Sequence, residues 1–134
     1  MALIGCLDTR FYFAHAEGRL PWTRRAVDEA RQQGSVLVSS TITITELLSE
    51  MALAVGLETV QHRINSAKVA GIGFIPPSEA IASLAGEISL KDKTLPIADA
   101  IIAATALNTT QGRVYTDDPH FEKIPGIHVL WGRA

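Results

Sequence analysis

Four acidic positions in this sequence fall where a chain of alternating strands and helices can bring them together. Asp8 directly follows a short apolar run, and either Asp117 or Asp118 follows another. Glu46 and Asp99 lie in the first turns of two predicted helices. Carboxylate oxygens without a Cys or His ligand pattern suit hard cations such as Mg²⁺ or Mn²⁺. Because such cations polarise phosphate esters and activate water, the pattern predicts phosphodiester hydrolysis.

Asp99 is the acid that is hardest to explain by structure alone. It lies in the stretch LPIADAIIAATAL, residues 95–107, which begins with Pro96 at a predicted helix start and is apolar on nearly every face. A helix that is hydrophobic all round is buried. No Lys or Arg occurs between Lys93 and Arg113 to neutralise the carboxylate locally. A buried carboxylate without a partner is costly, so Asp99 requires a proton, a hydrogen bond or a cation.

Each of the other acids also has an ordinary structural explanation. An Asp after a strand, such as Asp8, commonly caps a helix or forms a turn. An acid in a first helical turn, such as Glu46, is favoured by the helix dipole. Asp117 and Asp118 precede Pro119, so one of the two is expected to have only a turn role. The four acidic positions taken together favour a shared site more strongly than any one of them.

Neighbouring polar residues could support that site. The hydroxyls of Thr9 and Thr116 stand beside the acids, although capping is the favoured role for Thr9. Arg10 is a reasonable contact for a phosphate. His120 is expected on a surface loop. The histidines show no mutual ligand spacing, which makes a zinc site improbable; they are His15, His62, His120 and His128.

The elements that must position these residues alternate between strands and helices. Apolar runs predict five strands, at 2–7, 36–40, 72–75, 113–116 and 127–131. Helical spacing predicts five helices, at 22–33, 41–55, 57–70, 79–91 and from 96 to about 108. Gly34 and Gly56 are expected to end helices and Ser78 to cap one, whereas residues 42–45 could instead extend a strand. The alternation predicts a three-layer α/β/α sandwich with a mainly parallel sheet. Ligands bind beyond the carboxyl ends of such strands, where the acids fall.

Length and composition fit one globular domain, residues 1–134, with 47% hydrophobic and 19% charged residues. A single cysteine, Cys6, lies in an apolar run and is expected to be a small core residue. No signal peptide or membrane-spanning segment is recognisable, so the cytoplasm is the expected compartment. The net charge of −2 becomes +2 when four carboxylates are set aside as a metal cluster, leaving ten acids against twelve bases. The net charge therefore does not exclude binding of nucleic acid.

With these residues assembled, the sequence resembles the PIN-domain family, in particular the ribonuclease toxins of VapBC toxin–antitoxin pairs. The similarity covers essentially the whole chain. It rests on Leu7-Asp8-Thr9, Thr45-Glu46-Leu47, LPIADAIIAATAL and VYTDDPHF. The last of these matches a Thr-x-Asp-x-x-Phe pattern through Thr116, Asp118 and Phe121, and this assigns the fourth acid to Asp118 over Asp117.

The resemblance implies an α/β/α sandwich and Mg²⁺- or Mn²⁺-dependent endonucleolytic cleavage of RNA. It also implies a homodimer and a small antitoxin whose C-terminal segment covers the site. By carry-over from the family, the metal-binding acids are Asp8, Glu46, Asp99 and Asp118, with Thr116 supporting them.

Three alternatives compete with a toxin ribonuclease. The first is a PIN-like module that binds RNA or protein without cutting, although acids at all four positions argue against it. The second is a PIN nuclease that processes RNA outside a toxin–antitoxin system. The third is an aspartyl-phosphate phosphatase, which would need a second Asp two residues after Asp8, where Arg10 stands.

Overall fold

The computed structural model describes residues 3–18, 21–32 and 36–131, and a five-stranded parallel sheet forms its centre. The strands lie in the order β3-β2-β1-β4-β5. Their bounds are β1 Leu3–Leu7, β2 Val36–Ser40, β3 Gly73–Ile75, β4 Arg113–Tyr115 and β5 His128–Leu130. The predicted parallel sheet is confirmed.

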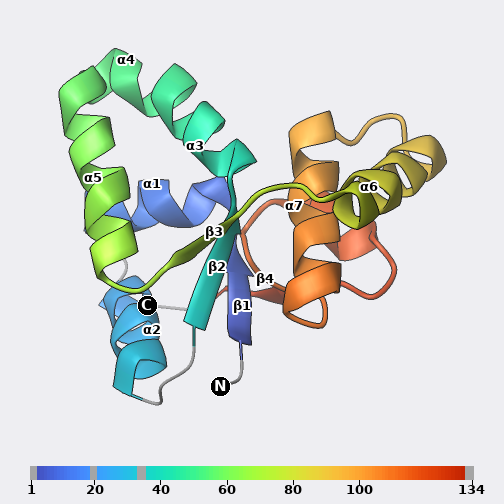
Figure 1. Ribbon diagram of the computed structural model, residues 1–134, viewed down its shortest axis with the longest axis horizontal. Helices are drawn as coiled ribbons and strands as arrows, with labels where there is room; N and C mark the ends of the chain where they lie inside the picture. The colour runs from blue at the N-terminus through green and yellow to red at the C-terminus, as the bar shows by residue number, and fades with distance from the viewer. Residues whose placement is uncertain (1–2, 19–20, 33–35, 132–134) are drawn as a thin grey trace.

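Helices cover both faces of this sheet (Figure 1). One face carries α1 (Thr9–Glu17) and α2 (Pro21–Gln32), and the other carries α6 (Glu79–Lys91) and α7 (Ile97–Thr109). Between β2 and β3 the chain forms a helical arch, made of α3 (Ile42–Glu46), the π-helical turn η1 (Leu47–Met51), α4 (Ala52–Val55) and α5 (Leu57–Val69). A 3₁₀ helix, η2 (Pro119–Lys123), follows β4. The three-layer α/β/α sandwich is therefore as predicted.

Alternating side chains of the central strands divide the core into two layers. Leu7 and Leu37 pack with the aromatic residues of α1 and α2, whereas Cys6 and Val38 pack with α7 and α6. Since both faces of a parallel sheet are covered, its strands are apolar on both sides. Cys6 is fully buried, and burial raises the pKa of its thiol to about 12. Its predicted role as a core residue is confirmed.

The helix expected over residues 41–55 is present, with one irregularity. The chain is helical from Ile42, so the possible extension of the strand is excluded. Directly after Glu46 the helix widens into the π-helical turn, and Leu47 and Met51 of that turn are buried in an apolar cluster under α5. Gly56 ends this segment at φ +91°, in the region that favours glycine.

The structure corrects the sequence-based description of the helices at three points. Residues 9–17, to which no element was assigned, form α1, which Asp8 caps. Pro96 is the N-cap of α7 and not its first helical residue. The same helix is not buried all round, because Ile97 is 63% exposed. Its first turn lies at the surface, and only the turns from Ala100 onward form the core.

Other expectations about element ends have mixed outcomes. Ser78 caps α6 as predicted, since its Oγ accepts a hydrogen bond from the Ile81 amide at 3.2 Å. Ala2 and Gly34, the expected ends of a strand and a helix, lie outside the described residues. In the described part of the chain, none of the helices has the length and apolar character that crossing a membrane requires.

Candidate metal centre

The strand order brings Asp8 and Thr116 together. β1 and β4 are neighbours in the sheet although more than a hundred residues separate them in sequence, and Leu7 is in register with Tyr115. Asp8 and Thr116 are the next residue of each strand, so both stand at the same carboxyl edge. The chain continues to β2 on one side of β1 while β4 lies on the other, which is the switch point where parallel sheets bind ligands.

Hydrogen bonds fix the Asp8 carboxylate on both oxygens. Thr116 Oγ1 donates to Asp8 Oδ2 at 2.7 Å, and the Thr9 amide donates to Asp8 Oδ1 at 2.8 Å. Thr116 Oγ1 also accepts from the Asp118 amide at 3.0 Å. Because Thr116 is fully buried and joins two acids, it acts as a positioning residue for both.

Glu46 reaches the same region from the helical arch. Thr9 Oγ1 donates to Glu46 Oε1 at 2.7 Å and lies 3.2 Å from Thr43 Oγ1. The expectation that Thr9 mainly caps backbone is therefore incomplete, because its hydroxyl orients a carboxylate 37 residues away. The π-helical turn after Glu46 is a feature that recurs at functional sites.

Asp99 and Asp118 complete the acidic group, and His120 lies with them. One ligand atom from each of these three residues can be chosen so that all lie within 4.8 Å of one another. His120 Nδ1 is 2.8 Å from Asp118 Oδ1, which also accepts from the His120 amide at 2.9 Å. His120 lies at the surface, as the sequence predicted, but the turn that Asp118 caps also brings its ring back to the acid.

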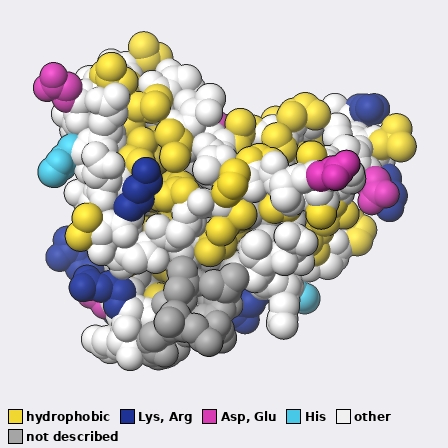
Figure 2. Space-filling model, viewed as in Figure 1, with side chains coloured by type: hydrophobic (Ala, Val, Ile, Leu, Met, Phe, Trp, Pro, Cys, Tyr) yellow, Lys and Arg dark blue, Asp and Glu magenta, His cyan; other side chains and the backbone are white. Residues whose placement is uncertain are grey.

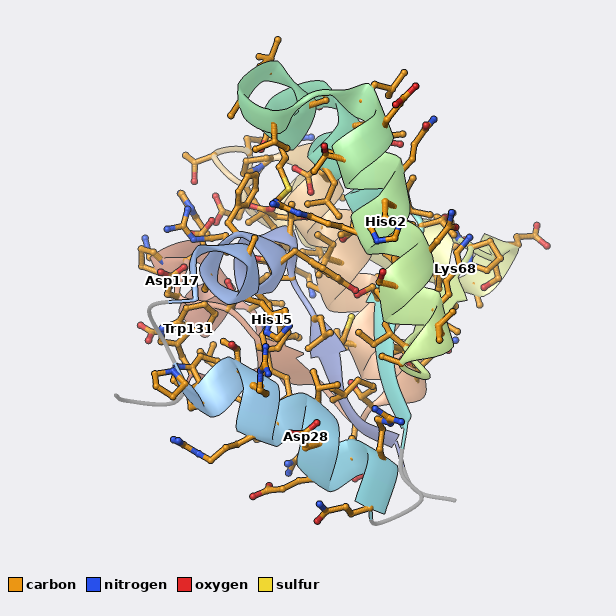
Figure 3. The ribbon with its side chains drawn as sticks, turned by 90° about the vertical axis from the view of Figure 1, so that its left-hand side faces the viewer. His15, Asp28, His62, Lys68, Asp117 and Trp131 are labelled. Carbon is orange, nitrogen blue, oxygen red and sulfur yellow. The ribbon has the colours of Figure 1, made fainter. Side chains whose placement is uncertain are left out.

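Asp117 points elsewhere, to Arg10. The Arg10 guanidinium donates to both carboxylate oxygens of Asp117, and the NH2 nitrogen lies 3.3 Å from Oδ2. Both side chains are exposed, at 55% and 38%. The geometry thus separates the two neighbouring acids, since Asp118 faces Asp99 and Asp117 pairs with a cation at the rim. Figure 3 shows Asp117 beside α1, away from α5.

The electrostatics of the group follow from burial and from like charges. Burial, with the negative charges of Glu46 and Asp118, raises the pKa of Asp8 to about 6, although the hydrogen bonds from Thr116 and Thr9 oppose this. Burial and then the charges of Asp8, Asp118 and Glu46 raise the pKa of Asp99 to about 7. Across residues 3–18, 21–32 and 36–131, neither Asp8 nor Asp99 has a salt bridge to Lys or Arg.

This donor set fits a divalent cation. These carboxylates lie close enough to raise one another's pKa, which means that their negative charges are not balanced by nearby positive charge. An ion such as Mg²⁺ or Mn²⁺ would supply that charge. Asp8 is only 2% exposed, and its hydrogen bonds hold the carboxylate in place without neutralising it. The need for a cation that the sequence set for Asp99 is therefore increased by three further acids at the same edge, which raise its pKa.

Comparison with known proteins identifies the class to which this fold and site belong. The sequence profile of the PIN domain family matches residues 6–127, and the chain belongs to that family. A comparison with curated proteins gives no significant match.

Among solved structures, the chain is similar in fold to toxin–antitoxin proteins. VapBC2 from Rickettsia felis, bound to a DNA fragment from its promoter, has 16% identity and a TM-score of 0.79, covering 98% of this chain and 100% of that chain. DNA-bound VapBC from Salmonella typhimurium has 19% identity and a TM-score of 0.75, with coverage of 96% and 97%. A toxin–antitoxin complex from Klebsiella pneumoniae has 23% identity and a TM-score of 0.67, with coverage of 94% and 95%.

Proposed function

We propose that this PIN-domain protein is a Mg²⁺- or Mn²⁺-dependent endoribonuclease and the toxin of a toxin–antitoxin pair. The observation that supports the proposal most directly is the convergence of Asp8, Glu46, Asp99 and Asp118 on one sheet edge, with raised pKa values at Asp8 and Asp99. Family membership and the fold shared with VapBC proteins support the same activity.

The four acids would hold the cation, which would supply polarisation of the phosphodiester and activation of water. Thr116 holds the Asp8 carboxylate, and Thr9 holds that of Glu46, so neither acid has to reorganise when substrate binds. Arg10, kept at the rim by Asp117, is placed to contact an RNA phosphate. No residue here is required as a covalent nucleophile.

The test compares wild type with Asp99→Asn on labelled RNA in Mn²⁺, Mg²⁺ or EDTA. Asp28→Asn is the matched control, since Asp28 is an acid on α2, away from the acidic group (Figure 3). We expect metal-dependent cleavage by wild type and the control, and none by Asp99→Asn, with melting curves confirming that all three are folded. A folded wild type that neither cleaves RNA nor gains stability from metal would refute the nuclease and favour a non-catalytic binding module.

An apolar hollow supports the antitoxin as partner. Its volume is about 350 Å³, and it lies between α1, α2, η1 and α5, where Phe11, Leu47, Met51 and Ile64 form part of its wall. Figure 2 shows hydrophobic side chains gathered inside the helical arch. We assign the hollow to apolar side chains of an antitoxin segment, because the similar structures are VapBC or toxin–antitoxin complexes.

Substitution in this hollow tests the assignment. Met51→Lys would add a positive charge beside Arg63, whose Nη1 lies 3.4 Å from Met51 Sδ, and we expect it to abolish co-purification with an antitoxin while metal binding persists. Retained co-purification would place the antitoxin on another surface. The homodimer remains a prediction, and light-scattering measurement of molar mass tests it. The cytoplasmic location also remains a prediction.

A further inference from the structure

His120 is held beside the acidic group by local backbone geometry. Asp118 caps the 3₁₀ helix η2, and its Oδ1 accepts from the His120 amide at 2.9 Å. The same turn places the His120 ring so that Nδ1 lies 2.8 Å from that oxygen. Without an ion, Nδ1 donates a hydrogen bond to this carboxylate oxygen, and an ion held by both atoms would replace that proton.

The separations suit one metal ion. In an octahedral complex with bonds of about 2.1 Å, adjacent ligand atoms are about 3 Å apart and opposite ones about 4 Å apart. The 2.8 Å between His120 Nδ1 and Asp118 Oδ1 is close to the adjacent value. The ligand atoms of Asp99, Asp118 and His120 together lie within 4.8 Å, slightly more than the opposite value. Small side-chain rotations would bring all three atoms onto one ion.

Solvent exposure and ligand chemistry both suit coordination of an ion by His120 and Asp118. The side chains of His120 and Asp118 are 41% and 20% exposed, so an ion can reach them from solvent. Imidazole nitrogen is a better ligand for transition metals than for Mg²⁺, which prefers oxygen.

We propose that His120 is a nitrogen ligand of the divalent ion at Asp99 and Asp118, and that it gives this site a preference for Mn²⁺ over Mg²⁺. The inference rests on the proposed metal-dependent function and adds a ligand to the four carboxylates. The competing role for His120 is to orient Asp118 through a hydrogen bond, without touching the ion.

The other histidines lie elsewhere in the fold. His15 Nδ1 is 2.9 Å from Thr23 Oγ1, against α2. His62 is exposed on α5, which contributes none of the four acids of the candidate metal centre (Figure 3). His128 begins β5 and is in register with Arg113, at the opposite end of the strands from the acids. A nitrogen ligand detected at this site would therefore come from His120, and His62→Gln is a matched control.

The test is pulsed electron paramagnetic resonance of the protein loaded with Mn²⁺. We expect ¹⁴N modulation on the Mn²⁺ signal in wild type and His62→Gln, and its loss in His120→Gln. Calorimetric titrations with Mn²⁺ and with Mg²⁺ should show that His120→Gln lowers the affinity for Mn²⁺ more than the affinity for Mg²⁺. Labelling wild type with ¹⁵N-histidine gives the same information without a substitution, because the modulation must change from the ¹⁴N to the ¹⁵N pattern.

The outcomes separate this inference from the proposed function. Mn²⁺ binding and RNA cleavage without nitrogen modulation would refute the ligand role and leave the nuclease intact. An equal fall in both affinities on His120→Gln would assign His120 to orienting Asp118 instead. Failure of wild type to bind either ion would overturn both proposals.

Discussion

Neutralising Asp8 should stabilise the metal-free protein at neutral and alkaline pH. Asp8→Asn keeps the shape of the side chain: Asn Oδ1 can accept from the Thr9 amide, and Asn Nδ2 can donate to Thr116 Oγ1 in place of the bond that Asp8 accepts. It removes a charge that burial disfavours and that Glu46 and Asp118 repel. Under the proposed function, a mutation at the metal centre would thus increase stability, because the acids would be arranged for a cation and not for folding alone.

The magnitude and its pH dependence follow from the pKa of Asp8. This pKa rises from its ordinary value of 3.8 to about 6 in the folded protein. Stability from protonated Asp8 is therefore complete below about pH 4 and is lost as the pH rises through about 6. The shift corresponds to an upper limit of about 3 kcal/mol. We expect the variant to equal wild type near pH 4 and to melt about 5–10 °C higher at pH 8.

The assay is thermal unfolding of wild type and Asp8→Asn in EDTA from pH 4 to pH 8, followed by circular dichroism. Asp28→Asn, which changes an acid on α2, should show no such divergence. With saturating Mn²⁺ the wild type should regain the lost stability, because the ion binds the ionised carboxylate. A ligand at about a hundred times its Kd adds about 2.7 kcal/mol to the free energy of unfolding. A difference between Asp8→Asn and wild type that is constant with pH, or that favours wild type at pH 8, would refute the reasoning.

Further substitutions test the surrounding structure by urea unfolding. Thr116→Val should cost about 1–3 kcal/mol because it removes the hydroxyl that joins two acids, and Thr116→Ser should recover most of this loss. Phe121→Ala should cost about 3–5 kcal/mol, since the ring is fully buried beside α7; a loss below about 1 kcal/mol would contradict that packing. Gly112→Ala should prevent stable folding, because φ is +83° and the new Cβ would lie 2.0 Å from the Gly126 carbonyl oxygen. Gly86→Ala, with open space around it in α6, should instead stabilise by about 0.5–1 kcal/mol.

Local sequence was sufficient for most of the fold. Apolar runs located all five strands, and helical spacing located the helices that pack on both faces, because these patterns report directly which residues are buried. The main omission was α1. Its residues Phe11, Tyr12 and Phe13 form a continuous aromatic run without clear helical spacing, and an Asp such as Asp8 can form a turn as well as cap a helix.

The candidate site was anticipated in type but not in detail. The acidic residues were recognisable because a carboxylate in an apolar helix, such as Asp99, is costly without a partner. Contacts made across the fold were not recognisable. The pairing of Arg10 with Asp117 and that of Thr9 with Glu46 join segments far apart in the chain, and no local pattern encodes them.

The sequence by itself predicted most of the element types and the parallel α/β class, and it suggested which residues could bind a hard cation. These follow from hydrophobic periodicity and from the chemistry of individual side chains. Only the tertiary structure decided that β4 lies beside β1, that Asp117 pairs with Arg10, and that His120 lies with Asp99 and Asp118. The physical reason is that strand order and side-chain direction depend on packing between distant segments, whereas residue type and spacing are local.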